Sequence, residues 1–280
     1  MGPTMSIPAP PAPGSVDTGG SEAGGLRSVA IATQVLHCFV EHAELGPTVV
    51  ARELGVAKST AFQALAALAA EGLLERSGAG RYRLSLSLFH YGQLALDRLP
   101  LRAVARPVMT ELSDSLRLMV QLGLPAGGHV IYVERVDTGG PGPLVSGEVM
   151  HQVAGYASSA GRAMAAFDPA IARATLAVPR VKHTPFTVTD TVRLERILAT
   201  TWVNGWVSSR EESALGYSAV AAPVFAPAAA GGQPRVAGAI SAVGRTAVVG
   251  GARKDFVVAT VRRAARQVTH LLALTQPPEH

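Results

Sequence analysis

The sequence has little of what several protein classes depend on. It contains one cysteine among its 280 residues, Cys38, which excludes an internal disulfide and a zinc site built from cysteines. Charged residues, prolines or glycines interrupt every apolar run before it reaches the roughly 20 residues that a membrane-spanning helix needs, so we expect no membrane partner. The first 25 residues also lack the apolar core of a secretion signal. Together these absences predict a cytoplasmic protein.

Motifs for catalysis and for nucleotide or metal binding are also missing. The segment Gly216-Tyr217-Ser218-Ala219-Val220 lacks the second glycine of the G-x-S-x-G nucleophile turn, and no histidine or aspartate partner for Ser218 or Ser159 is evident. The chain has no GxxxxGKS/T phosphate loop and no HxxxH or HExxH spacing. We therefore expect no catalytic residue, no metal and no cofactor, and interpret the protein as a non-enzyme.

What the chain does contain is enough apolar material for folded domains. Hydrophobic residues make up 48% of the sequence and charged residues 16%, which excludes global disorder. The length favours about two domains. The formal net charge of +5 favours a polyanionic partner only mildly, because 25 basic residues face 20 acidic ones.

The hydrophobic spacing predicts an ordered chain behind a Pro- and Gly-rich tail. Residues 1–25 cannot bury enough apolar surface to offset their ordering entropy, and order should begin near Leu26 with a helix capped by Ser28. The expected helices are 28–42, 48–54, 58–71, 85–98, 101–117, 159–167, 169–177, 191–204 and 254–274, and the expected strands include 73–76, 81–84, 120–124 and 129–136.

Residues 49–68 have the pattern of a helix-turn-helix. Ala51 is small where two helices would cross, Gly55 suits a turn that needs a positive φ, and Ala61 falls on the inner face of the second helix. That helix opens with polar side chains, as a recognition helix in the major groove requires, and Gln63 can pair bidentately with an adenine.

Two short strands around residues 77–80 predict a hairpin that would act as a wing. Residues 45–100 carry six basic and four acidic residues, so tight binding to DNA should need two or more such domains at once. The expected DNA contacts are Thr48, Arg52, Lys58, Ser59, Thr60, Gln63, Arg81 and Arg83.

With these segments the sequence resembles the IclR family of bacterial transcriptional regulators over residues 26–274. The resemblance implies an α/β (α+β) protein with a winged helix-turn-helix, a linker helix and a GAF-like effector-binding domain. It also implies a homodimer or homotetramer that binds double-stranded DNA at a palindromic operator, as a repressor or an activator, under the control of a small-molecule effector. The matching stretches are Leu26–Val29, Val56–Thr60, Gly72–Leu74, Ala157–Ala163, Gly205–Val207, Glu211–Glu212, Gly216, Ala221–Phe225 and Val236–Ser241.

On this basis we expect five segments along the chain. They are a disordered tail (1–25), the winged domain (26–85), the linker helix (86–100), the effector-binding domain (101–274) and a short tail (275–280).

The resemblance also implies an effector pocket at the helix start Ser159-Ala160-Gly161, where backbone N–H groups could hold a carboxylate. Ser209 stands where the family often has aspartate, Ala219 where it often has cysteine, and Val243 where it has a second serine. Because the polar anchors are fewer, we expect a larger or more apolar effector than glyoxylate-like acids, such as an aromatic acid. The expected lining is Val145, Val153, Ser159, Ala160, Gly161, Ser209, Tyr217, Ala219, Ile240, Ser241 and Val243.

Three further interpretations stay open. Arg162, where the family usually has lysine, is expected to pair with a carboxylate or a helix end, and Glu211 and Glu212 to form a solvated turn. Gln63 stands where the family often has arginine. That substitution leaves an alternative function open, a GAF-like ligand sensor that acts through protein–protein contacts without specific DNA binding.

Overall fold

The structure is a computed structural model that describes residues 22–40, 42–138, 152–228 and 232–275. The chain divides into two compact units, Met1–Ala95 and Leu96–His280, and each has its own hydrophobic core. Among the helices of the described residues, none has the length and apolar character that crossing a membrane requires.

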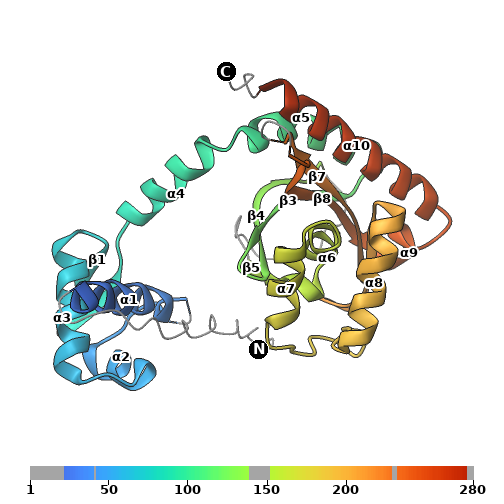
Figure 1. Cartoon of the computed structure of the whole chain (residues 1–280). Helices are drawn as coiled ribbons and strands as arrows, with labels where there is room; N and C mark the ends of the chain where they lie inside the picture. The colour runs from blue at the N-terminus through green and yellow to red at the C-terminus, as the bar shows by residue number, and fades with distance from the viewer. Residues whose placement is uncertain (1–21, 41, 139–151, 229–231, 276–280) are drawn as a thin grey trace. The chain divides into compact units, whose positions relative to one another are not determined.

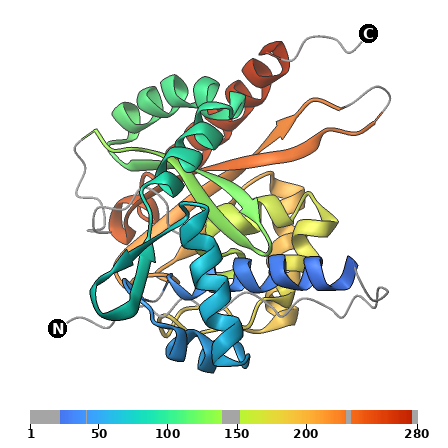
Figure 2. The same ribbon diagram turned by 90° about the vertical axis from the view of Figure 1, so that its left-hand side faces the viewer.

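The first unit is a bundle of three helices followed by a hairpin (Figures 1 and 2). Its elements are α1 (Glu22–Cys38), α2 (Pro47–Leu54), α3 (Lys58–Ala70), β1 (Leu74–Ser77), a short 3-10 turn (Gly78–Gly80) and β2 (Arg81–Leu84). Leu45 pairs with Tyr82 of β2 through two backbone hydrogen bonds, so the hairpin is tied to the helices. The core consists of Val35, Phe39, Leu45, Val50, Ala61, Leu65, Leu68, Leu74 and Tyr82.

The turn between α2 and α3 confirms the helix-turn-helix. Gly55 has a φ of 64°, a left-handed conformation that glycine adopts without steric cost, and its N–H donates to the Ala51 carbonyl. Ala61 is fully buried in the unit's core. The local spacing of small residues therefore predicted this element correctly.

The start of the first helix differs from the prediction. α1 begins at Glu22 rather than at Ser28, so Ser28 lies inside the helix and is not its cap. Residues 25–30 are exposed, and such a helical turn needs no apolar face to mark it in the sequence. The expected tail is thus wrong for residues 22–25, while residues 1–21 lie outside the described residues.

One helix, α4 (Ser87–Asp97), contains the point at which the chain divides into the two units. It falls within the expected linker helix, and it ends before Leu99 and Pro100. Pro100 occupies the first turn of the next helix, where a missing N–H costs nothing.

The second unit is built on a six-stranded antiparallel sheet with the strand order β5-β4-β3-β8-β7-β6. β7 and β8 form its longest pair (Figure 2). Gly127 and Gly128, with φ of 55° and 86°, make the tight turn between β3 and β4. The strands are β3 (Met119–Ala126), β4 (His129–Val136), β5 (Gln152–Ala154), β6 (Val207–Arg210), β7 (Tyr217–Ala226) and β8 (Arg235–Arg245).

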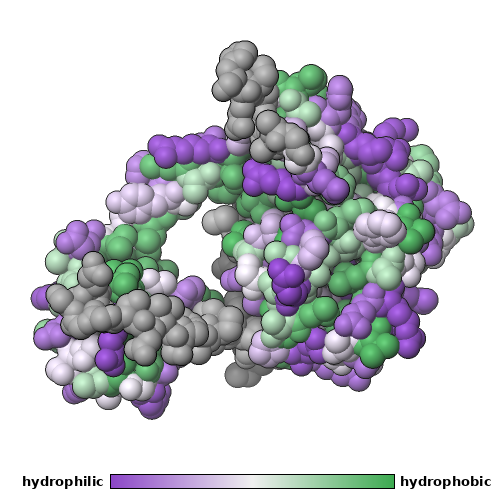
Figure 3. Space-filling view, viewed as in Figure 1, coloured by the Kyte–Doolittle hydropathy of each residue, from purple (hydrophilic) through white to green (hydrophobic). Residues whose placement is uncertain are grey.

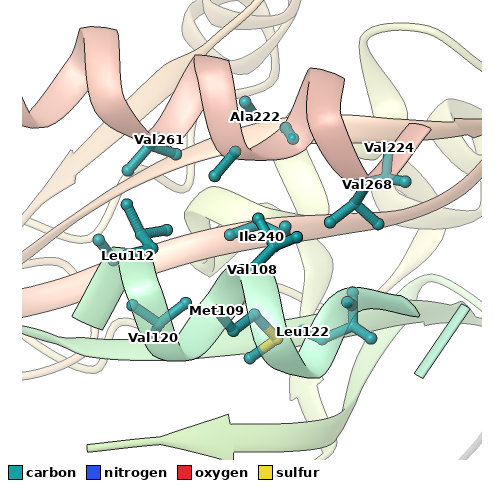
Figure 4. Close-up of a cluster of buried hydrophobic side chains, with 14 of the residues drawn as sticks. Val108, Met109, Leu112, Val120, Leu122, Ala222, Val224, Ile240, Val261 and Val268 are labelled. Atoms are coloured by element: carbon teal, nitrogen blue, oxygen red, sulfur yellow. The ribbon is translucent and has the colours of Figure 1, made fainter. Parts of the chain in front are cut away.

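Helices cover both faces of this sheet, which confirms the expected mixed α/β fold with a GAF-like second domain (Figure 1). α5 and α10 pack on one face, where Val108, Met109 and Leu112 of α5 meet Val261 and Val268 of α10 over the sheet (Figure 4). α6 packs on the opposite face. The helices are α5 (Pro100–Leu116), α6 (Ser159–Ala165), α7 (Pro169–Ala177), α8 (Thr191–Asn204), α9 (Thr246–Val249) and α10 (Lys254–Thr275), with a 3-10 turn at Gly155–Ala157.

The last helix ends one residue later than expected, at Thr275, and the rest of the expected short tail, residues 276–280, lies outside the described residues. Its outward side is hydrophilic (Figure 3), and Arg263 and Arg266 are exposed. The sequence reasoning did not predict α9.

Candidate functional site

The start of α3 is an exposed helix N-terminus without a side-chain cap. Ala57 occupies the capping position and can accept no N–H through its side chain. The first intrahelical bond runs from the Ala61 N–H to the Ala57 carbonyl. The N–H groups of the first turn therefore point outward with no intrahelical acceptor, and such groups bind phosphate. α2 likewise has a cap residue, Gly46, that makes no side-chain bond.

Polar side chains surround this helix start. Lys58, Ser59 and Gln63 are exposed and Thr60 is half-buried, so α3 offers the polar face that the sequence predicted. The structure adds Phe62, which is 51% exposed on the same helix and was missed by the sequence reasoning. The sequence contained a signal for this exposure. Phe62 directly follows Ala61, which faces the core, so it falls outside the apolar face of the helix. A phenylalanine there could contact a thymine methyl group in a major groove.

The two predicted arginines of the hairpin differ in their partners. Arg83 donates from Nε and Nη2 to the Glu75 carboxylate at 3.1 and 2.9 Å, across the pairing of β1 with β2. Arg81, at the tip, has no carboxylate within 4 Å in the described residues. Of the two guanidinium groups, that of Arg81 is therefore the more available to bind a phosphate. Thr48 and Arg52 on α2 are exposed.

Cys38 is a half-buried thiol at the end of α1. Its Sγ donates to the Gln34 carbonyl at 3.3 Å. Burial, together with the nearby Glu53 carboxylate, raises the pKa of the Cys38 thiol to about 11. His42 and Glu53 form an exposed pair at 2.9 Å beside it. The thiol therefore stays protonated near neutral pH and serves the packing of this unit.

On the second unit, several expected effector residues lie together on the α6 face of the sheet. Ser209, Ala219 and Val243 are direct cross-strand partners on β6, β7 and β8. Because side chains alternate along a strand, Tyr217 and Ser241, two residues away on β7 and β8, share that face. The register thus groups residues that are more than thirty positions apart in the sequence.

The same face holds buried hydroxyl groups. The Ser241 Oγ is fully buried and has no hydrogen-bond partner in the described residues. The Tyr132 hydroxyl lies near Ser158 and Ser241, and burial raises the pKa of Tyr132 to about 12 although those two hydroxyls lower it. Register also places Gln121 and Arg135 in the row of Ser241. The sequence reasoning missed Tyr132, Gln121 and Arg135, which become visible only through strand pairing.

The start of α6 is more enclosed than a helix start whose N–H groups are all available to a carboxylate. Ser158, not Ser159, caps the helix, and its Oγ accepts the Gly161 N–H at 2.9 Å. Ser159, Ala160 and Gly161 are all buried. A Cβ at Gly161 would clash with the Gly155 backbone, so the first turn of α6 packs closely against the 3-10 turn at Gly155–Ala157. The Gly161 N–H is therefore already used, and only the first two N–H groups of α6 stay unassigned.

A buried ion pair holds α6 in place. Arg162 is 1% exposed and donates to both carboxylate oxygens of Glu212, at 2.7 and 2.5 Å, and to the Tyr156 carbonyl. Glu212 also accepts the Val188 N–H. The expected carboxylate partner of Arg162 is thus confirmed. The expected solvated turn is wrong for Glu212, which is buried in this ion pair. Local sequence patterns could not show this, because Arg162 lies 50 residues away in the sequence.

Comparison with known proteins identifies the chain. Residues 93–270 match the family described as the C-terminal domain of the bacterial transcriptional regulator IclR, and residues 28–78 match the IclR helix-turn-helix domain. The chain belongs to the IclR family. It is an IclR-type helix-turn-helix transcriptional regulator, as the sequence resemblance implied.

Relatives align over most of this IclR-type chain. The glycerol operon regulatory protein of Streptomyces coelicolor is 31% identical, over 80% of this chain and 87% of its own length. The transcriptional regulator KipR of Bacillus subtilis is 27% identical, over 89% and 98%. The crystal structure of an IclR homologue from Microbacterium hydrocarbonoxydans, complexed with 4-hydroxybenzoate, is 26% identical with a TM-score of 0.67, over 89% of this chain and all of that one.

One expected pocket residue of this IclR-type regulator lies on the wrong face. Ile240 is fully buried in the core with α5 and α10, on the side opposite Ser241 (Figure 4). Adjacent residues of a strand point to opposite faces, so Ile240 cannot line a pocket together with Ser241. Val153 on β5 is half-buried and packs against the α6 core. Val145 lies outside the described residues.

Features that would suggest catalysis have structural partners. The hydroxyl of Ser218 lies 2.9 Å from that of Thr246, and no histidine ring in the described residues hydrogen-bonds to Ser218 or Ser159. The described residues also contain no group of three or more His, Cys, Asp or Glu side chains that could hold a metal ion. The curated relatives of this IclR-type chain are named as regulators.

Proposed function

We propose that this protein binds a palindromic DNA operator as a homodimer or homotetramer, and that a small carboxylate or aromatic-acid effector changes its affinity for that operator. The observation that carries the DNA-binding part is the start of α3. Its first-turn N–H groups lack a side-chain cap, and Lys58, Ser59 and Gln63 stand exposed around them. Arg81 adds a cation without a carboxylate partner in the described residues.

Fluorescence anisotropy of the full chain on the DNA flanking its own gene, at two salt concentrations, tests this part. Specific, salt-sensitive binding that survives competitor DNA supports the proposal. The double variant Lys58→Ala/Arg81→Ala should flatten the slope of log affinity against log salt by about 0.9 for each phosphate that a side chain no longer neutralises. The control, Arg173→Ala/Lys182→Ala, removes two exposed cations of the second unit and should leave the slope unchanged. Weak binding that is equal on unrelated DNA would favour the sensor that acts through protein contacts.

The effector part is supported by the α6 face of the sheet. Ser241 keeps a buried hydroxyl without a partner in the described residues, and the Tyr132 hydroxyl, which can donate to an acidic group, lies near it. Ser209, Ala219 and Val243 add no charge. A ligand with one acidic group and an apolar or aromatic body matches this combination, and one solved homologue is complexed with 4-hydroxybenzoate.

Calorimetric titration of the full chain with 4-hydroxybenzoate and with glyoxylate tests the effector class. We expect the aromatic acid to bind more tightly, and tighter binding of glyoxylate would contradict the proposal. Ser241→Ala should weaken binding of the aromatic acid by about tenfold and lower stability little, because within the described residues the Ser241 Oγ has only the nearby Tyr132 hydroxyl to interact with. Thr200→Ala, which removes an exposed hydroxyl on α8, should change neither quantity.

A further inference from the structure

A cavity of about 290 Å³ lies on the second unit, and of the row of Ser209, Ala219 and Val243 it includes Ser209 but neither of the other two. It is bordered by the edge strand β6, by β7, by α9 and by the first residue of α10, and α9 lies beside that end of α10 in Figure 1. The side chains that matter for its chemistry are those of Ser208, Arg210, Ser218, Thr246 and Lys254.

The charged groups that line this cavity are all cations. Arg210 and Lys254 line it, and no aspartate or glutamate does. In the part of the chain that the structure describes, neither cation has a carboxylate within 4 Å. Glu211 and Asp255, the sequence neighbours of the two cations, lie outside the lining. The Lys254 ammonium is 5.8 Å from the centre of the Trp206 ring, which leaves its N–H groups available to a ligand.

The position of Lys254 strengthens the argument for an anion. It is the first residue of α10, a helix of 22 residues, and the partial positive charge of a helix N-terminus disfavours a cation there. Asp255 in the same turn offsets part of this repulsion. An anion bound between Lys254 and Arg210 would neutralise both cations and the helix end together.

Hydroxyl groups complete the lining. Ser218 is 5% exposed, and its Oγ lies 2.9 Å from the Thr246 Oγ1, so the pair uses one O–H proton in its mutual bond. The second O–H proton of the pair is left to donate to a ligand. Ser208 adds an exposed hydroxyl. Several donors and two cations around a small space suit the three terminal oxygens of a phosphate monoester, which arginine can bind through two parallel bonds.

We propose that this cavity is a second ligand site, distinct from the effector face, for a small phosphorylated metabolite. Its volume is near the lower limit of small-molecule pockets, so it accepts a phosphate with a short polar body rather than a nucleotide. The site shares β6 with the effector face, because Ser208 and Arg210 alternate with Ser209 along that strand.

Calorimetric titration of the full chain in phosphate-free buffer, with glycerol 3-phosphate and with inorganic phosphate, tests the proposal. We expect saturable binding of glycerol 3-phosphate at one site per chain, and no binding of glycerol. Arg210→Gln and Lys254→Gln should each weaken binding about tenfold. Both side chains are exposed, so the fold should survive, and a thermal melt verifies this. Arg263→Gln, an exposed arginine on α10 outside the cavity, is the matched control and should bind like the parent.

Three outcomes would overturn the proposal. The first is the absence of saturable binding at millimolar phosphate ester. The second is equal binding of the ester by the parent and both cavity variants, and if those variants also lose DNA affinity, the two cations serve nucleic acid. The third is binding of inorganic phosphate alone, with none of the ester.

Discussion

The helices α3 and α6 begin in opposite ways. α3 starts after Ala57, which gives its first turn no side-chain acceptor, and Lys58 and Ser59 beside it are exposed. α6 starts after Ser158, whose hydroxyl accepts the Gly161 N–H, and every residue of α6 is buried. The N-terminus of α3 therefore faces solvent with N–H groups that have no acceptor. The N-terminus of α6 is enclosed, and one of its N–H groups is already hydrogen-bonded.

This difference shows which groups are left for a ligand in each unit. At α3 the backbone itself can receive a large anion such as a DNA phosphate. At α6 the cap and the packing against Gly155 leave fewer backbone N–H groups for a ligand. In the proposed effector site, side chains of the strands, above all Ser241 and Tyr132, would therefore carry more of the recognition. The family resemblance predicted both sites, and the two caps differ in which groups each proposed site would use.

Among these predictions the largest change in stability is expected from the ion pair between Arg162 of α6 and Glu212. Glu212→Ala leaves the Arg162 guanidinium buried without its carboxylate, which should lower the free energy of unfolding by about 3–5 kcal/mol. Urea unfolding followed by circular dichroism measures this. The double variant Arg162→Met/Glu212→Leu removes both charges and should recover much of the stability. A decrease below about 1 kcal/mol in Glu212→Ala would mean that the pair does not hold α6 in place.

A smaller loss of stability is expected from removing the N-terminal cap of α6. Ser158→Ala removes the acceptor of the Gly161 N–H in a buried turn, and should lower the free energy of unfolding by about 1–2 kcal/mol. The same unfolding experiment measures it, with Ser158→Thr as the control, since threonine keeps the hydroxyl. If Ser158→Ala is as stable as the parent, the start of α6 does not depend on its cap and the contrast with α3 is weaker than the structure suggests.

Local patterns predicted the first unit well because its fold follows from short-range spacing. The turn at Gly55 and the burial of Ala61 depend on residues within one helical turn or two, and both were predicted correctly. α1 was less predictable, because its first turns are exposed and carry no apolar stripe. The polar start of α3 could also be predicted, but the partner of Arg83 required the pairing of β1 with β2.

The second unit depends on contacts between distant segments, and there the sequence predicted less. The row that joins Ser209, Ala219 and Val243 exists only through strand register. Ile240 was assigned to the pocket beside Ser241, although neighbouring residues of a strand face opposite ways, so the sequence alone could have excluded one of them. The partner of Arg162 lies 50 residues away, and no local signal points to it.

A smaller effect is expected from giving α3 the cap that it lacks. Ala57→Asp places a carboxylate where it can accept the first-turn N–H groups, and its charge should repel DNA phosphate. We expect the affinity for operator DNA to fall by about 1 kcal/mol while thermal stability is unchanged or higher. Anisotropy titration measures the affinity. Ala57→Asn separates capping from charge, since asparagine caps without a negative charge, and should weaken DNA binding less. Unchanged affinity in Ala57→Asp would place the DNA phosphates away from this helix start.

The smallest effect concerns the exposed ion pair of the hairpin. Glu75→Ala removes the carboxylate that holds Arg83, and because both side chains are exposed the free energy of unfolding should change by less than about 0.5 kcal/mol. The freed guanidinium can then reach a phosphate, which would steepen the slope of log DNA affinity against log salt by up to about 0.9. Arg83→Ala in the parent should flatten that slope less than Arg81→Ala does, because Arg83 is already paired. Equal effects of Arg81→Ala and Arg83→Ala would show that DNA displaces Glu75 from Arg83, and that the pair restrains the wing only in the absence of DNA.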